Sequence, residues 1–484
     1  MIRVLSIKRL LFGFVFLVFV TATGYAQGSF VYVNNNNIGG PNSVTAFSVA
    51  ANGVLTPIAG SPFLTGGTGN NLGLFAANRS TICTMGNRLY VANDGSNNVT
   101  GFDINPATGF LTIVPGSPFA TGGIANGSGM SLDCTDDAKF LIAAYANSSG
   151  PSSNITVFSI AANGTLAPVP GSPFPAINQP RAIKVSPSSG FLFVAEGDNL
   201  IEAFSISANG ALTPVPGSPF PGGATLPFSG VAGLEINCAG TLLFVPLSGF
   251  PGGVSVFNIS PAGALTPISG SPFPTGGLNA LAAVLSPNEQ FLFVSNQMSG
   301  ITVHNVAGNG SLSLVPGSPF SAGASPQQLS INKSGSLLYV NSGTSGTLSV
   351  LSIAGNGVLT TVPGSPFPAG SGTLPSVSAF PPKSCDFDIC LQDESNGNLL
   401  RVNSTTGAYE FTDCKGVTIG GTGRITRRGC LITLEVNGPD RRVLARIDTC
   451  MKSGTASVQL FSTGRNFSVF DRNIANNTCA CPGG

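Results

Sequence analysis

The chain has 484 residues, of which 42% are hydrophobic and only 8% are charged, and its formal net charge is +1. A chain of this length is longer than those that usually fold around a single hydrophobic core, so several domains or a repeat array are expected. A near-neutral charge excludes an electrostatic basis for binding nucleic acid or an anionic membrane surface. The 64 glycines and 36 prolines predict a β protein rich in tight turns.

Residues 1–26 have the pattern of a secretory signal peptide. Arg3, Lys8 and Arg9 precede the apolar run LLFGFVFLVFV, and small residues up to Ala26 suit a signal peptidase. The run is shorter than the ~20 residues of a membrane-spanning helix. We therefore expect an exported bacterial protein, secreted, periplasmic or on the cell surface, without a membrane anchor after cleavage.

The following residues, 27–383, repeat one unit seven times. Each unit has four short segments rich in Val, Ile, Phe and Thr, such as 182–187, 191–196, 200–206 and 211–220, divided by turn residues. Four antiparallel strands per unit, at this period, predict an all-β fold with a seven-bladed β-propeller. The tetrapeptide Gly-Ser-Pro-Phe closes each unit and begins at Gly60, Gly116, Gly171, Gly217, Gly270, Gly317 and Gly364.

The repeated tetrapeptide indicates architecture and not catalysis. Proline cannot donate to a sheet ladder, so the segment TPVPGSPF must form the outermost strand of its blade. The first unit lacks an innermost strand, whereas an additional segment at 373–382 matches one. We predict that three strands from the start and one from the end build a single blade and close the ring.

Segments in these units carry a family resemblance. FVYVNNN (30–36), LYVAND (89–94), FLFVSNQ (291–297) and LLYVNSG (337–343) resemble the YVTN-type repeats of lactonase-like seven-bladed propellers, which are similar to 6-phosphogluconolactonase. The resemblance covers about residues 28–382. It implies the fold, and it implies lactone hydrolysis only if a suitable site exists.

Candidate site residues are few. His304, the only histidine, aligns with phenylalanines of five other units and is interpreted as a packing residue. One unit places Arg181 at the start of its innermost strand, and Glu196 and Asp198 in a loop at the same end. Asp94 is the matching acidic residue of an earlier unit. These four are weak binding candidates, either a charged rim of the channel or a surface ion pair and a turn residue.

No cofactor or metal site is expected. The run DCTDDAK with Asp133, Asp136 and Asp137 lacks calcium-loop spacing and is interpreted as a turn. No nucleophile elbow, phosphate loop or paired zinc-binding histidines occur in the sequence. The basic run containing Arg424, Arg427 and Arg428 is interpreted as a solvated face.

Residues 384–484 form a second, smaller unit, for which alternating stretches such as 430–436 predict a Cys-rich β domain. After export, disulfides would stabilise its modest core; zinc is the minor alternative. Its candidate disulfide cysteines are Cys385, Cys390, Cys414, Cys430, Cys450, Cys479 and Cys481.

Three further cysteines, Cys83, Cys134 and Cys238, occupy nearly equivalent positions in different units. Facing sheets stack ~10 Å apart, farther than a disulfide reaches. We therefore expect buried thiols, although convergence of the blades toward the axis weakens this argument for Cys83 with Cys134.

The main functional interpretation is a monomeric exported binding or scaffold module without a catalytic site. Its partner would be a polar ligand such as a glycan, or a cell-envelope protein. The alternative is a lactonase-like hydrolase acting at the mouth of the central channel. An enzyme would show convergent titratable groups there.

Overall fold

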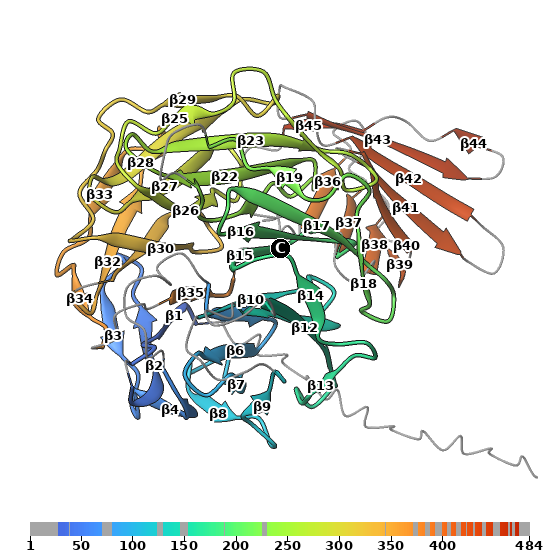
Figure 1. Ribbon diagram of the computed structural model, residues 1–484. Coiled ribbons are helices and arrows are strands. Elements are labelled where there is room, and N and C mark those ends of the chain that lie inside the picture. The colour runs from blue at the N-terminus through green and yellow to red at the C-terminus, as the bar shows by residue number, and fades with distance from the viewer. Residues whose placement is uncertain are drawn as a thin grey trace, which may run out of the picture.

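The computed structural model describes residues 28–382 except 38, 70–79, 123–128, 146–152, 188, 225–229, 344 and 371–375. Beyond these it gives only the backbone of strands between residues 388 and 473. The expected signal peptide, 1–26, lies outside the described residues. The described secondary structure is β throughout, and seven antiparallel sheets form the ring of a β-propeller, as predicted (Figure 1).

The first four blades contain the following strands, from the innermost outward. Blade 1 contains β35 (Ser376–Phe380), β1 (Phe30–Asn34), β2 (Pro41–Val49), β3 (Leu55–Pro57) and β4 (Phe63–Thr68). Blade 2 contains β5 (Ile82–Met85), β6 (Arg88–Asn93), β7 (Asn98–Ile104), β8 (Leu111–Ile113) and β9 (Phe119–Ala120). Blade 3 contains β10 (Met130–Cys134), β11 (Phe140–Tyr145), β12 (Ser153–Ile160), β13 (Leu166–Pro168) and β14 (Phe174–Ala176). Blade 4 contains β15 (Pro180–Val185), β16 (Phe191–Glu196), β17 (Leu200–Ile206), β18 (Leu212–Pro214) and β19 (Phe220–Pro221).

The remaining three blades follow the same order. Blade 5 contains β20 (Gly230–Val231), β21 (Glu235–Ile236), β22 (Leu242–Ser248), β23 (Gly253–Ile259), β24 (Leu265–Pro267) and β25 (Phe273–Pro274). Blade 6 contains β26 (Ala280–Leu285), β27 (Phe291–Asn296), β28 (Gly300–Val306) and β29 (Leu312–Leu314). Blade 7 contains β30 (Pro326–Ile331), β31 (Leu337–Ser342), β32 (Thr347–Ile353), β33 (Leu359–Thr361) and β34 (Phe367–Pro368).

Two further sheets follow the propeller in the chain. One contains β36 (Asp388–Gln392), β37 (Leu399–Asn403), β38 (Ala408–Thr412) and β39 (Thr418–Thr422). The other contains β40 (Arg424–Arg428), β41 (Leu431–Asn437), β42 (Arg442–Asp448), β43 (Thr455–Ser462), β44 (Arg465–Asn466) and β45 (Phe470–Asn473). The predicted β character of this unit is therefore confirmed, while its side chains lie outside the described part.

The ring has two faces, which differ in the loops that they carry. The turn face carries the hairpin turns between the innermost and second strands, such as the turn at Gly86 and Asn87. The opposite face is the entry face. There the chain enters each innermost strand, and there the loop between the second and third strands lies, as at Asp94.

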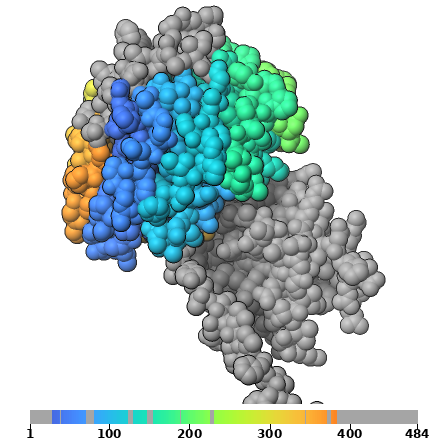
Figure 2. All heavy atoms as spheres, turned by 90° about the horizontal axis from the view of Figure 1, so that it is seen from below, coloured from blue at the N-terminus to red at the C-terminus, as the bar shows by residue number. Residues whose placement is uncertain are grey.

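Blade 1 joins the two ends of the propeller, which confirms the predicted closure. β35 pairs antiparallel with β1, from Phe30 opposite Phe380 to Asn34 opposite Ser376. Blades 7 and 1 also share a core cluster that includes Tyr339, Val350 and Val33. Figure 2 shows the orange end of the propeller beside its blue beginning.

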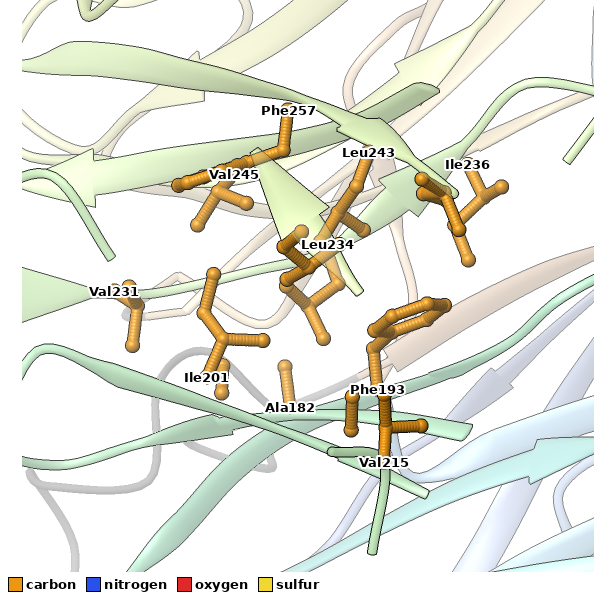
Figure 3. Close-up of a cluster of buried hydrophobic side chains, with 14 of the residues drawn as sticks. Ala182, Phe193, Ile201, Val215, Val231, Leu234, Ile236, Leu243, Val245 and Phe257 are labelled. Carbon is orange, nitrogen blue, oxygen red and sulfur yellow. The ribbon is translucent and has the colours of Figure 1, made fainter. Parts of the chain in front are cut away.

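Apolar side chains fill the space between adjacent blades. Between blades 4 and 5, Phe193 and Ile201 pack with Val245 and Phe257 in one buried cluster (Figure 3). Full burial of such a side chain contributes about 1.5–3 kcal/mol. Each blade therefore depends on its neighbours for burial, as expected of a repeat fold.

The Gly-Ser-Pro-Phe segment interrupts the outermost strand of each blade, as its prolines predicted. In blade 4, β18 and β19 both pair with β17, and the cis Ser218–Pro219 bend lies between them. Gly217 begins the bend at a φ of +89°, where glycine is favoured.

The serine of this bend replaces the hydrogen bond that the interrupted strand cannot make. Ser218 Oγ accepts a hydrogen bond of 2.9 Å from the Ala203 N–H on β17. The same bond recurs in every blade, made by Ser61, Ser117, Ser172, Ser271, Ser318 and Ser365. The repeated motif therefore supplies a hydrogen-bond acceptor for a backbone N–H group of the third strand in each blade.

We expect Ser218→Ala to lower the free energy of unfolding by about 1–2 kcal/mol, because it leaves the Ala203 N–H without its acceptor. Chemical denaturation measures the change. Ser205→Ala is the matched control, because the Ser205 hydroxyl donates to Thr213 at an exposed position. An equal loss in both variants would contradict this role.

Candidate functional site

Blade 4 collects charged side chains at the entry face, as the sequence predicted. Arg181 lies at a β-bulge between Pro180 and Ala182, opposite the end of β16, where Glu196 lies. Bulges re-aim side chains and are common beside active sites. Asp198 follows in the exposed turn before β17. Arg181, Glu196 and Asp198 therefore share one end of one blade.

A second glutamate, which the sequence analysis missed, completes this cluster. Glu202 on β17 is 4% exposed and Glu196 is 0% exposed, and the two carboxyl groups lie close enough for Glu196 to affect the pKa of Glu202. Glu202 Oε2 also accepts a 3.1 Å bond from the Ile177 N–H.

The environment favours the protonated form of Glu202. Burial raises the pKa of its carboxyl group, and the nearby charge of Asp198 acts in the same direction. Glu196 and the hydrogen bond from the Ile177 backbone lower this pKa, without reversing the effect of burial. The pair can thus accept or release a proton at the entry-face end of blade 4.

Comparison among blades shows how Glu202 could have been found from the sequence. The position two residues before the aligned phenylalanine holds a hydroxyl residue in the other six blades, namely Thr45, Thr100, Thr156, Ser255, Thr302 and Ser349. In blades 2 and 6 this hydroxyl accepts a 2.9 Å bond from Asn93 or Asn296, the counterparts of Glu196. Blade 4 alone replaces the Asn–Thr pair by two carboxyl groups.

Arg181 does not form the expected ion pair with Glu196 or Asp198. Ion pairs among the described residues join Arg88 to Asp103, Lys139 to Asp137 and Lys184 to Glu235. Burial lowers the pKa of Arg181, and the charge of Asp198 raises it. Its guanidinium lies close to Gly197 and Gly230. It is therefore positioned between blades 4 and 5.

Asp94 lies elsewhere, in a buried polar network. It is 1% exposed and accepts hydrogen bonds from Asn36 Nδ2 at 3.0 Å and from the Met130 N–H at 3.2 Å. These donors belong to blades 1 and 3, whereas Asp94 follows β6 of blade 2. We therefore assign Asp94 a role in linking three blades.

A second charged cluster, also missed by the sequence analysis, lies inside the channel. Lys184 Nζ is 3.3 Å from Glu235 Oε2, and Asp133 Oδ2 accepts a 2.8 Å bond from the Val185 N–H. Glu235 raises the pKa of Lys184, against the effect of burial. Burial raises the pKa of Asp133, against the charge of Lys184.

These contacts correct the interpretation of DCTDDAK as a turn. Asp136 and Asp137 do lie in the turn, but Asp133 lies on β10 and binds the backbone of β15. Hydroxyl groups make equivalent links elsewhere, since Ser376 accepts from the Thr81 N–H and Ser330 from the Ala379 N–H, both at 3.0 Å. The cluster stabilises the open edges of the innermost strands.

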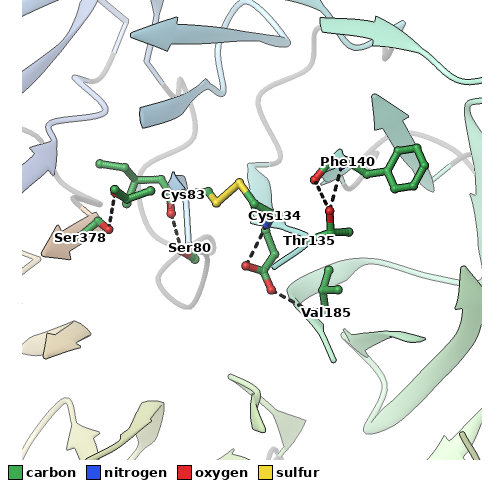
Figure 4. Close-up of a disulfide and its surroundings, with 10 residues drawn as sticks. Ser80, Cys83, Cys134, Thr135, Phe140, Val185 and Ser378 are labelled. Atoms are coloured by element: carbon green, nitrogen blue, oxygen red, sulfur yellow. Dashed lines mark hydrogen bonds between the residues drawn. A yellow bond between two sulfur atoms is a disulfide. The ribbon is translucent and has the colours of Figure 1, made fainter. Parts of the chain in front are cut away.

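The expectation of free thiols at Cys83 and Cys134 is wrong. A disulfide joins them across β5 and β10, with 6.2 Å between the Cα atoms (Figure 4). The sheet spacing of ~10 Å does not hold at this position, because the innermost strands converge toward the axis. Cys238 is also disulfide-bonded.

His304 occupies a packing position, in agreement with its interpretation. It is 1% exposed on β28, the third strand of blade 6, at the site of Phe102 or Phe257 in other blades. Burial lowers the pKa of His304 to about 4, and the carbonyl groups of Pro274 and Leu292 counter this in part. It is remote from the innermost strands.

His304 should make the fold sensitive to acid. The unfolded histidine binds a proton below pH ~6.5, while the folded one stays neutral to pH about 4, so stability falls as the pH drops between these values. We expect the free energy of unfolding of His304→Phe, relative to that of wild type, to be about 2–3 kcal/mol higher at pH 4.5 than at pH 7.5. Urea unfolding at both pH values measures this; parallel pH dependences would contradict it.

The tail candidates cannot be placed. The side chains of Cys385, Cys390, Cys414, Cys430, Cys450, Cys479 and Cys481, and those of Arg424, Arg427 and Arg428, lie outside the described part. Among the side chains that are described, no group of three or more His, Cys, Asp or Glu residues is arranged to hold a metal ion. No described helix is long and apolar enough to cross a membrane.

A family model described as Lactonase, 7-bladed beta-propeller matches residues 43–225 and 250–374. The chain belongs to this family. Membership in the lactonase family confirms the resemblance seen in the strand repeats. It also contradicts the main functional interpretation, a scaffold without a catalytic site, and favours the hydrolase alternative.

Solved structures support the same fold for this lactonase-family chain. A "putative 6-phosphogluconolactonase" from Bacteroides fragilis NCTC 9343 is 19% identical, with a TM-score of 0.58, covering 74% of this chain and 99% of its own. The periplasmic gluconolactonase of Pseudomonas aeruginosa is also 19% identical, with a TM-score of 0.58 and coverages of 73% and 99%. No protein with a curated description matches this sequence.

Proposed function

We propose that the protein is a lactonase that hydrolyses a sugar lactone at the entry-face mouth of blade 4. Family membership favours this chemistry. The observation that carries the proposal is the pair of buried carboxyl groups of Glu196 and Glu202, at the same end of blade 4 as Arg181, in a ring whose corresponding positions otherwise hold amides, hydroxyls and apolar groups. A buried carboxyl group of raised pKa, such as that of Glu202, is typical of catalytic sites.

The chemistry follows from these groups. A water molecule attacks the lactone carbonyl carbon, and the ionised carboxyl of the pair accepts a proton from that water. The Arg181 guanidinium stabilises the negative charge that develops on the carbonyl oxygen. The bond from carbon to the ring oxygen then breaks, and the proton passes from the glutamate pair to that oxygen, which yields the open hydroxy acid.

Charge at the site favours an uncharged lactone. Glu196, Glu202 and Asp198 surround the position, and Arg181 is the one cation that the described residues place at this end of blade 4. The other described cations lie on the turn face or deep in the channel, namely Arg88, Lys139, Lys184 and Lys333. A phosphate dianion would meet net repulsion at this site.

We therefore expect the mature protein to hydrolyse glucono-1,5-lactone at least ~10-fold more efficiently, by kcat/KM, than its 6-phosphate. Acid release above the spontaneous rate measures both reactions, and Arg181→Gln should lower the enzymatic rate by about 10²–10³-fold. Preference for the phosphate would contradict the substrate class. The absence of turnover with both lactones would contradict the proposed site.

Export completes the proposal. The signal-like residues 1–26 support synthesis as a precursor, and the Cys83–Cys134 disulfide suits an oxidising compartment. The P. aeruginosa neighbour is described as periplasmic. Fractionation of expressing cells, with the amino terminus of the mature protein determined by mass spectrometry, tests this location.

A further inference from the structure

Blade 3 departs from the other blades at one position of the repeat, the third residue after the phenylalanine of Gly-Ser-Pro-Phe. The other six blades have a glycine here, with φ between 73° and 115°. These glycines are Gly66, Gly122, Gly223, Gly276, Gly323 and Gly370. Blade 3 has Ile177, whose φ is not positive, because a β-branched side chain disfavours that region. The Ile177 side chain is 57% exposed, so core packing does not account for the exchange.

The peptide group before this position links adjacent blades where the repeat is regular. Between blades 1 and 2, the Thr100 hydroxyl on β7 donates a 2.8 Å hydrogen bond to the carbonyl of Thr65, which precedes Gly66. Between blades 2 and 3, the Thr156 hydroxyl on β12 donates a 2.6 Å bond to the carbonyl of Thr121 in the same way. The peptide group therefore turns its carbonyl toward the third strand of the next blade, and that strand supplies the donor.

The same peptide group points the opposite way between blades 3 and 4. Glu202 stands at the position of Thr100 and Thr156, and it accepts its 3.1 Å hydrogen bond from the Ile177 N–H. The N–H and C=O groups of a trans peptide point in opposite directions, so the peptide between Ala176 and Ile177 is turned over relative to the repeat. The two orientations of a peptide in a turn differ in whether the φ of the following residue is negative or positive. Isoleucine thus selects the orientation that presents a donor.

We propose that Ile177 is a positioning residue of the proposed catalytic pair, because its side chain keeps this peptide in the orientation that holds an N–H group against Glu202. A carbonyl in that place could not bond to an ionised carboxyl group, which has no proton to donate. The role in catalysis rests on the proposed hydrolysis, whereas the peptide orientation can be measured without it.

The groups that set the charge of Glu202 come from both blades. Burial raises the pKa of its carboxyl group, Glu196 and the Ile177 N–H lower it, and Asp198 raises it. Arg181 lies at the same end of blade 4. Loss of the Ile177 donor therefore keeps the Glu202 carboxyl group protonated to a higher pH.

The pH–rate profile tests this role in catalysis. Ile177→Gly permits the positive φ of the other blades, and we expect it to move the acidic limb for glucono-1,5-lactone to higher pH and to lower kcat on that limb by about tenfold or more. Ile177→Ala is the matched control, because alanine also disfavours positive φ although the same exposed side chain is removed. It should keep the wild-type profile. The same profile in both variants would overturn the inference.

A stability measurement tests the peptide orientation without turnover. Ile177→Gly should raise the unfolding equilibrium constant about tenfold in wild type and at least ~3-fold less in Glu202→Thr, where the introduced threonine can donate to the Ala176 carbonyl. The entropic effect of glycine is common to both backgrounds and cancels. Urea denaturation of the four proteins measures the coupling, and additive effects would overturn the inference. Coupling in a protein that hydrolyses no lactone would contradict the proposed hydrolysis and confirm the peptide orientation.

Discussion

Glu196→Gln is expected to lower kcat for hydrolysis of a neutral lactone by about 10²–10⁴-fold, with KM changed much less. The glutamine amide has nearly the shape of the carboxyl group but cannot accept the proton of the attacking water. Steady-state kinetics with glucono-1,5-lactone, corrected for spontaneous hydrolysis, measure the effect. The fold should persist, because blades 2 and 6 hold an amide at the same position, Asn93 and Asn296.

The repeats supply the controls for this experiment. Glu196→Asn combined with Glu202→Thr reproduces the Asn–Thr pair of blades 2 and 6, and should give a folded protein without activity. Asn296→Gln, in blade 6, should leave kcat within ~3-fold of wild type. Glu202→Gln removes the neighbouring titratable group, and we expect it to shift the kinetic pKa on the acidic limb of the pH–rate profile. Full activity in Glu196→Gln would eliminate the proposed mechanism.

Deletion of residues 373–484 should abolish cooperative folding, whereas deletion of 385–484 should leave a folded propeller. Only the longer deletion removes β35, and with it the pairing to β1 and the burial of Val377, Ala379 and Phe380. These side chains and the strand ladder contribute roughly 5–10 kcal/mol, comparable with the whole stability of a domain. Thermal unfolding followed by circular dichroism measures both variants. Equal melting temperatures would show that β35 does not close the ring.

The sequence predicted the features that depend on order along the chain. The seven copies of Gly-Ser-Pro-Phe indicated the number of blades, prolines placed the outermost strand, and the unmatched segments at both ends predicted the closure at β35 and β1. Arg181 and Glu196 were placed at one end of one blade because strand direction alternates. Each of these inferences needed only local turns and strand periodicity.

Features that depend on distances between blades were not predictable in the same way. Innermost strands of adjacent blades are not paired in one ladder, so no register in the sequence relates Asp133 to Val185 or Lys184 to Glu235. The Cys83–Cys134 disulfide was rejected because sheet spacing was applied close to the axis, where it fails. Glu202 differs from these, because aligning the units reveals a carboxylate where the other blades carry hydroxyls.

Because β1 and β35 are neighbours in one sheet, the position at which the gene begins is not dictated by the architecture. Gly28 and Pro382 flank strands whose residues Phe30 and Phe380 face each other with ring centroids 6.0 Å apart. In tail-free protein, a short linker from Pro382 to Gly28 would convert the propeller into a cycle that could be opened at another exposed outer bend. Such a circular permutant would start and finish within a different blade and keep every interface between blades, although its order of synthesis would change.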